Sequence, residues 1–101
     1  MICIKIHESY RKIVTMCDAP LIGKKFSEGN LQLDLKESFY GGKEFKEDKA
    51  VDFIKEIAME DATFNIVGEE SVRAAVKAGL IEDKKGCIIK IQGIPHALSL
   101  I

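Results

Sequence analysis

Strand-like segments lie at both ends of this chain and helix-like segments lie between them, and this order limits the folds that it can adopt. Apolar residues alternate with other residues at positions 2–6, as in a half-buried strand. Five segments are predicted to be strands: residues 2–6, 11–17, 31–35, 87–92 and 97–101. Two further segments, residues 48–59 and the segment from Gly68 to Gly79, predict helices, each with one apolar face.

The order β-β-β-α-α-β-β predicts an α+β protein. Short connections favour antiparallel pairing, and two helices are enough to cover one face of a sheet. We therefore expect a two-layer sandwich, with a mostly antiparallel sheet of about five strands and two helices on one face. One hundred and one residues suit a single domain over residues 1–101.

Several connections carry predictions of their own. Asp18 is expected to cap a short helical turn that follows it, and residues 23–29 are expected to form a loop. Residues 62–67 fit either a short buried strand or a continuation of the first helix, and we favour a buried connector. Gly79 occupies the position of a left-handed helix cap, and residues 82–86 are predicted to form a polar turn.

Composition excludes several classes of function. Fifteen basic and sixteen acidic residues give a net charge of −1, so the chain as a whole does not attract nucleic acid or anionic membranes. The apolar runs are shorter than the about 20 residues that span a bilayer, and the N-terminus lacks the features of a signal peptide. We expect a cytoplasmic protein without a membrane partner.

Cysteine and histidine usage predicts no metal and no cofactor. The three cysteines lack Cys-x-x-Cys spacing, and the two histidines complete no zinc-binding pattern. Buried free thiols in a reducing compartment are the favoured interpretation. Cys17 ends a predicted strand, where an exposed nucleophile is the less favoured alternative.

The first candidate site is the segment Gly93–Ala97. Gly93 and Pro95 predict a tight bend, because proline cannot donate a ladder hydrogen bond and belongs at a bend or a sheet edge. His96 lies beside them and titrates near neutrality when unperturbed. His96 is therefore a candidate general acid–base, and the alternative is a histidine whose hydrogen bonds fix the bend.

A second bend is predicted at Phe39, Tyr40, Gly41 and Gly42. The two aromatic rings can offer a stacking platform for a base, with Lys24, Lys25 and Lys43 reaching the nucleic-acid backbone. The structural alternative, which we favour, is that the aromatic pair closes the edge of the core, with Phe39 buried and Tyr40 half exposed.

Two further features are candidates for ligand binding. Asn65 lies in an apolar segment, so its amide must find hydrogen-bond partners or bind a ligand. Lys24 and Lys25 follow Gly23 in a flexible loop that can hold a phosphate, although no complete phosphate-binding motif is present and solvated lysines are the simpler interpretation.

Five motifs occur in a characteristic order: Leu21–Phe26, Phe39–Gly42, Asn65–Gly68, Ala78–Ile81 and Gly93–Ala97. As an ordered set they resemble the archaeal family catalogued as domain of unknown function 424, over essentially the whole chain. The resemblance implies a small archaeal α+β protein with a two-layer sandwich, and it supplies no activity.

Three functions follow from these features, while the oligomeric state is not indicated. The preferred one is a binding module that engages RNA or a translation-related complex, for which Lys24, Lys25 and Lys43 must share one positive patch. The second is an enzyme that uses His96 with Asn65 and a lysine. The third is a protein-interaction subunit with an exposed sheet edge near residues 97–101. All depend on the predicted bends and Asn65 meeting in space.

Overall fold

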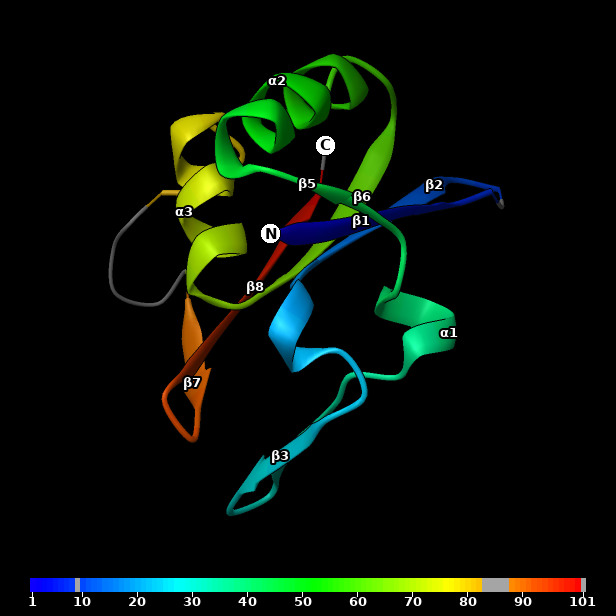
Figure 1. The fold of residues 1–101 in the computed structure, drawn as a ribbon. Coiled ribbons are helices and arrows are strands. Elements are labelled where there is room, and N and C mark those ends of the chain that lie inside the picture. Colours follow the sequence, from blue (N-terminus) through cyan, green and yellow to red (C-terminus); the bar gives the residue numbers. More distant parts are fainter. Residues whose placement is uncertain (9, 83–87, 101) are drawn as a thin grey trace.

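The computed structural model describes residues 1–8, 10–82 and 88–100, and within these it contains a six-stranded sheet (Figure 1). The strands run in the order β5-β1-β2-β6-β8-β7. Their bounds are β1 (Ile2–His7), β2 (Lys12–Asp18), β5 (Lys43–Phe45), β6 (Ala62–Val67), β7 (Ile89–Ile91) and β8 (Ile94–Leu100). Neighbours are antiparallel except β2 and β6, which are parallel. The α+β class is confirmed, with six strands rather than about five.

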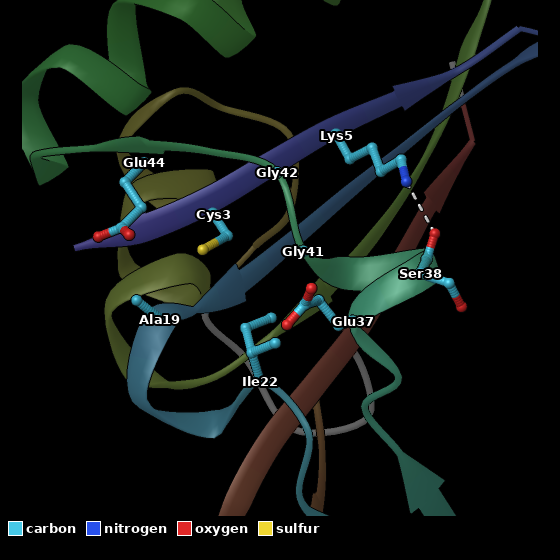
Figure 2. A pocket seen from close by; sticks show the side chains of 9 residues that line it. All are labelled: Cys3, Lys5, Ala19, Ile22, Glu37, Ser38, Gly41, Gly42 and Glu44. Atoms are coloured by element: carbon cyan, nitrogen blue, oxygen red, sulfur yellow. Dashed lines mark hydrogen bonds between the residues drawn. The ribbon is translucent and has the colours of Figure 1, made fainter.

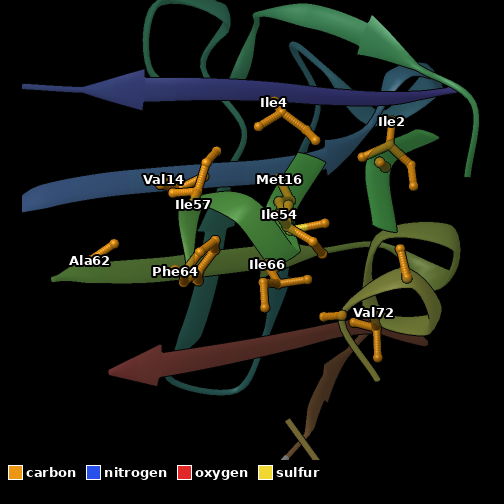
Figure 3. Close-up of a cluster of buried hydrophobic side chains, with 13 residues drawn as sticks. Ile2, Ile4, Val14, Met16, Ile54, Ile57, Ala62, Phe64, Ile66 and Val72 are labelled. Carbon is orange, nitrogen blue, oxygen red and sulfur yellow. The ribbon is translucent and has the colours of Figure 1, made fainter. Parts of the chain in front are cut away.

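Two helices cover one face of this sheet, as predicted: α2 (Glu47–Ile57) and α3 (Glu69–Lys77). The apolar faces of both helices pack on alternate residues of β1, β2 and β6, which form the main core (Figure 3). Phe64 and Ile54 are fully buried at its centre. The two helices are also joined by ion pairs, because Glu47 of α2 accepts hydrogen bonds from Arg73 and Lys77 of α3.

The opposite face of the sheet, called here the α1 face, is covered in part by four smaller elements, of which the sequence predicted the turn after Asp18 and the strand from residue 31. These are the four-residue helix α1 (Glu37–Tyr40), the 3-10 turn η1 (Ala19–Leu21) and a two-stranded hairpin of β3 (Lys25–Glu28) and β4 (Leu31–Asp34). A second buried cluster lies beneath them and includes Leu33, Leu35 and Tyr40. The predicted strand at residues 31–35 thus exists outside the main sheet, and the predicted loop at residues 23–29 is partly strand.

Residues 62–67 form β6 rather than a connector or a helical extension. The strand lies at the centre of the sheet, parallel to β2 and antiparallel to β8. Its residues alternate between the main core and the α1 face, with Phe64 and Ile66 on the core side. Thr63 and Asn65 alternate with these core residues in the sequence, which is the period-two pattern of a strand with one apolar face.

The bend predicted at Gly93–Ala97 is placed wrongly, because Pro95 lies within a strand. Residues 94–100 form β8, an inner strand, and the bend is the two-residue turn of Gln92 and Gly93, both with positive φ. Pro95 accepts a hydrogen bond from the Gly68 N–H at 2.9 Å. The Gly68 carbonyl, which a residue other than proline would bond in return, instead accepts the Val72 N–H of α3 at 2.9 Å. The missing proline N–H therefore leaves no orphaned acceptor.

Asp18 also departs from its predicted role, because its side chain makes no cap for η1. Its carboxylate instead accepts hydrogen bonds from the Glu70 and Ser71 N–H groups in the first turn of α3. Gly68 has a φ of 105°, and a Cβ at this position would overlap the Asp18 carboxylate. The residue at the end of β2 therefore caps α3 through a hydrogen bond with Glu70, which lies 52 residues later in the sequence.

The cap at the other end of α3 is confirmed. Gly79 has a φ of 80°, and the Leu80 N–H bonds the Ala75 carbonyl at 3.0 Å, as in a Schellman motif. Residues 83–86 of the predicted polar turn lie outside the described residues, as do Cys87 and Ile101.

Candidate functional site

The alternation of side chains along each strand brings most of the predicted site residues to the α1 face. The residues that face α1 and its neighbours from four adjacent strands are Cys3, Lys5 and His7 of β1, Thr15 and Cys17 of β2, Asn65 of β6 and His96 of β8. The register places Lys5 opposite Thr15 and Thr15 opposite Asn65. A band of polar side chains therefore crosses the sheet beneath α1.

Asn65 is the centre of this band. Its Oδ1 atom accepts a hydrogen bond from the Tyr40 hydroxyl at 3.1 Å and lies 3.0 Å from the Nε2 atom of His96. An amide oxygen only accepts, so the Nε2 atom of His96 carries the hydrogen of this bond. The imidazole, the carboxamide and the aromatic corner at Phe39–Gly42 thus meet in space.

The backbone of α1 is held on the sheet by two side chains. The carbonyl oxygen of Phe39 accepts hydrogen bonds from the Thr15 hydroxyl at 3.0 Å and from His7 Nε2 at 2.9 Å. The His7 ring also stacks on Phe39, with centroids 4.6 Å apart, and Phe39 meets Tyr40 edge to face. The aromatic pair closes this edge of the core, but Tyr40 is the buried residue and Phe39 is partly exposed, the reverse of the expected order. Its rings are engaged with His7 and with each other.

Burial shifts the pKa values of three groups at this face. It lowers the pKa of His96 below 6.5, so the imidazole is uncharged at neutral pH. It raises the pKa of the Tyr40 hydroxyl, an effect that the hydrogen bond to Asn65 partly offsets. Burial, followed by the nearby Asp18 and Cys3, raises the pKa of the Cys17 thiol to about 12. Cys17 therefore lacks the thiolate that a nucleophile requires.

A cavity of about 460 Å³, called here the α1 pocket, opens between β1, β5 and α1 (Figure 2). Side chains of Lys5, Glu37 and Glu44 give it charge, and the Cys3 thiol lies at its floor. Its remaining lining comes from Ala19, Ile22, Ser38, Gly41 and Gly42. The Lys5 ammonium donates to the Ser38 carbonyl at 2.8 Å. Within the described residues, neither Glu37 nor Glu44 takes part in an ion pair.

Gly41 and Gly42 shape this pocket by allowing close approach of the backbone. A Cβ on Gly42 would overlap the Ile4 carbonyl of β1, and a Cβ on Gly41 would lie 2.6 Å from the Glu37 carbonyl oxygen. Glycine at both positions therefore lets the chain pass from α1 into β5 directly over β1. Their place in the site is the wall of the α1 pocket.

The predicted lysine patch is not formed. Lys24 and Lys25 lie at the start of the β3–β4 hairpin, and Lys25 approaches Asp34 at 3.9 Å. Lys43 lies on the α2 side of the sheet, where its ammonium sits 5.7 Å from the Phe45 ring centroid. The backbone N–H groups of Gly23 and Lys24 bond the Leu35 and Leu21 carbonyls, so they are not available to a phosphate.

Gly93 and Pro95, the other predicted site residues, lie outside the polar band. Gly93 belongs to the exposed β7–β8 turn, and Pro95 faces the α3 side, where it lines a smaller pocket of about 290 Å³. His96 does not line the α1 pocket or this smaller pocket. Exposed apolar side chains flank it instead, because Ile89 is its register partner and Leu98 follows two residues later.

Sequence reasoning missed the charged residues of the α1 pocket. In the sequence, Lys5 is only one polar residue of an alternating strand, and nothing distinguishes Glu37 and Glu44 from the other acidic residues. A signal was present in the glycine pair between them, because adjacent glycines mark a place where backbone approaches another element closely. Among the described residues, no three His, Cys, Asp or Glu side chains are grouped so that they can hold a metal ion.

The fold and the site define a small α+β sandwich with a polar band and a charged pocket on the side away from its two main helices. The sequence matches the family described as "Protein of unknown function (DUF424)" over residues 6–100, and the chain belongs to this family. No curated protein matches the sequence.

A solved structure shares the fold. The crystal structure of an uncharacterized conserved protein from Methanopyrus kandleri superimposes with a TM-score of 0.87 at 26% sequence identity. The match covers 99% of this chain and 90% of that chain. The expected archaeal family and sandwich architecture are thereby confirmed. Within the described residues, no helix is long and apolar enough to cross a membrane.

Proposed function

We propose that this protein is a cytoplasmic binding module whose α1 pocket receives a basic side chain of a protein partner. The observation that carries the proposal is the charge of the pocket. Two carboxylates, Glu37 and Glu44, line it without ion-pair partners in the described part of the chain, against one ammonium that is already bonded to a carbonyl. An arginine or lysine side chain complements this arrangement.

The polar band supports binding rather than catalysis. Its members bond one another: Asn65 serves both Tyr40 and His96, and the Phe39 carbonyl serves Thr15 and His7. No buried side-chain nitrogen or oxygen among the described residues lacks a partner. Such a network rigidifies the surface around the α1 pocket, which reduces the ordering cost of binding.

RNA is disfavoured as the direct ligand by the same charges. The three lysines required for a phosphate-binding patch lie on different sides of the sheet, and the pocket presents acids rather than cations. Segments rich in arginine and lysine are common in proteins that themselves bind nucleic acid. Association with a translation-related complex is therefore consistent with a basic protein partner.

The test uses two labelled peptides, Thr-Val-Arg-Val-Thr and the same peptide with uncharged citrulline in place of arginine. The arginine peptide is expected to bind about tenfold more tightly, and the double variant E37Q/E44Q is expected to abolish the difference. E56Q is the matched control, because Glu56 is exposed on α2, away from the pocket. Equal binding of both peptides, or binding of a short single-stranded RNA in their place, overturns the proposal.

An enzyme that uses His96 is the second candidate, and one contact favours it. The imidazole is half buried, uncharged near neutrality and hydrogen-bonded to Asn65, as a general base requires. Its exposed surroundings are apolar, since Ile89 and Leu98 flank it. Chemical shifts of the His96 ring in a screen of small carbonyl and phosphate compounds test this role. A compound that perturbs His96 and is turned over would support it, and an unperturbed ring would exclude it for those classes.

A further inference from the structure

We infer that the partner binds as an extended strand that adds to the free edge of β5, with its basic side chain entering the α1 pocket from that edge. This inference rests on the proposed function and specifies the shape of the partner. β5 is the end strand of the main sheet, so within the described residues only β1 pairs with it. An unpaired strand edge is a template for another chain.

The backbone of Glu44 is directed toward this free edge. The Ala19 N–H bonds the Met1 carbonyl at 2.9 Å, and hydrogen-bonded pairs recur at every second residue of an antiparallel ladder. Cys3 therefore bonds β2, whereas the backbone groups of Ile2 and Ile4 point toward β5. In β5, Lys43 and Phe45 face β1, which leaves the N–H and C=O of Glu44 pointing outward.

The side chain and the backbone of Glu44 can therefore bind the same ligand. The side chain lines the α1 pocket while the backbone presents one donor and one acceptor at the sheet edge. A residue opposite Glu44 in an added strand would place its Cβ about 5 Å away, on the same face of the sheet. An arginine at that position reaches Glu44 directly and Glu37 across the pocket.

Charge also decides against a second copy of this chain as the occupant. If two β5 strands paired antiparallel about Glu44, the two Glu44 carboxylates would stand opposite each other, and like charges so placed are destabilising. Lys43 does not block the edge, since its ammonium lies over the Phe45 ring on the α2 side. The edge is therefore selective for a strand that carries a basic residue.

The experiment compares the arginine peptide with a version that is methylated on the backbone nitrogen of arginine itself, which donates to the Glu44 carbonyl in an antiparallel pair. Methylation removes this ladder donor and leaves the charge of the peptide and the protein unchanged. If the strand adds to β5, the methylated peptide is expected to bind at least about tenfold more weakly. The exchange of the Glu44 amide hydrogen should slow when the unmodified peptide is present.

Two variants of the protein separate the inference from the proposed function. E44Q removes the charge and keeps the N–H, whereas E44P removes both, at an edge strand that tolerates proline. Strand addition requires E44P to bind more weakly than E44Q, with both variants folded by circular dichroism. If arginine is preferred over citrulline but methylation has no effect and the two variants are equal, strand addition is wrong and the pocket stands. If the arginine peptide does not bind, both are wrong.

Discussion

The Oδ1 atom of Asp18 accepts hydrogen bonds from both the N–H and the hydroxyl of Ser71, each at 2.8 Å. The two residues are 53 positions apart. The contact joins the end of β2 to the first turn of α3, on the opposite side of the parallel β2–β6 pair from α1. This carboxylate is buried and satisfies the N-terminus of α3, so it belongs to the framework that holds the site.

Replacing Asp18 with alanine is expected to lower the free energy of unfolding by about 1–3 kcal/mol, because the Glu70 and Ser71 N–H groups lose their acceptor. Urea denaturation followed by circular dichroism measures the change. D48A is the matched control, since Asp48 is exposed and its carboxylate accepts a bond from the adjacent Lys49 N–H rather than from a distant element. Equal losses in both variants would show that the Asp18 cap is not specific.

The Asn65→Leu variant is expected to lose about 1–3 kcal/mol, because Tyr40 and His96 would both face an apolar side chain. T63V, on the same face of β6, should change stability much less. A double-mutant cycle with Y40F measures the coupling between Tyr40 and Asn65, which should be clearly positive. Additive effects of N65L and Y40F would contradict a shared hydrogen bond.

Stability is expected to decrease as the pH falls below 6.5. Burial places the pKa of His96 below its unfolded value of 6.5, so the unfolded chain binds more protons between the two values. The free energy of unfolding therefore rises with pH through this window, and protonation of His96 favours unfolding. The H96Q variant should reduce this slope, as measured by thermal denaturation at a series of pH values. An unchanged slope in H96Q would assign the effect elsewhere.

The ion pairs between α2 and α3 are expected to make stability depend on pH in a second, more acidic range. Hydrogen bonds from Arg73 and then Lys77 lower the pKa of Glu47 to about 2, against 4.5 in the unfolded chain. The contribution of Glu47 is therefore complete above pH 4.5 and is lost as the pH falls toward 2. In E47Q the loss of stability below pH 4.5 should be smaller than in the unaltered protein, by denaturant titration at each pH.

The thiol of Cys17 is expected to be inert in the folded protein. With a pKa of about 12, about one molecule in ten thousand carries the thiolate at pH 8. In a variant that retains Cys17 alone (C3S/C87S), a thiol-reactive dye should label the protein only at the rate of unfolding. Rapid labelling without denaturant would show that Cys17 is accessible and ionised.

The parts of the fold that sequence patterns predicted share one property, which is that their local signals agree with their final surroundings. Ile2, Ile4 and Ile6 alternate in sequence and all face the main core. The apolar face of residues 48–59 likewise became the buried face of α2. Such agreement between local pattern and global packing is what makes an element predictable.

The elements that were missed obey rules that depend on distant residues. Pro95 is tolerated in an inner strand because the carbonyl of Gly68, the N-cap of α3, accepts the Val72 N–H and is not left unpaired. Asp18 resembles a cap for the turn that follows it, yet its partner is Ser71. Likewise, α1 is only four residues long and is held by the side chains of His7 and Thr15. Propensity alone does not support so short a helix.

Sequence patterns predicted the centre of the polar band but not the charged residues of the α1 pocket. Asn65 was recognisable because a lone amide in an apolar segment must be bonded, and His96 because few groups titrate near neutrality. Lys24 and Lys25 appeared to be binding residues since they follow a glycine, but that glycine serves the hairpin. No local sequence pattern identified Glu37 and Glu44, because the two residues share a pocket only where β5 approaches α1 in the folded chain.

The position of β8 inside the sheet has a consequence for synthesis on the ribosome. The strand is the last described element to be made, yet it lies between β6 and β7 and supplies His96 to the band beneath α1. While the ribosomal exit tunnel holds residues 94–100, β6 has an open side and Asn65 lacks one partner. β8 can therefore join the sheet only after residues 94–100 have left the tunnel, and until then β6 presents an unpaired strand edge.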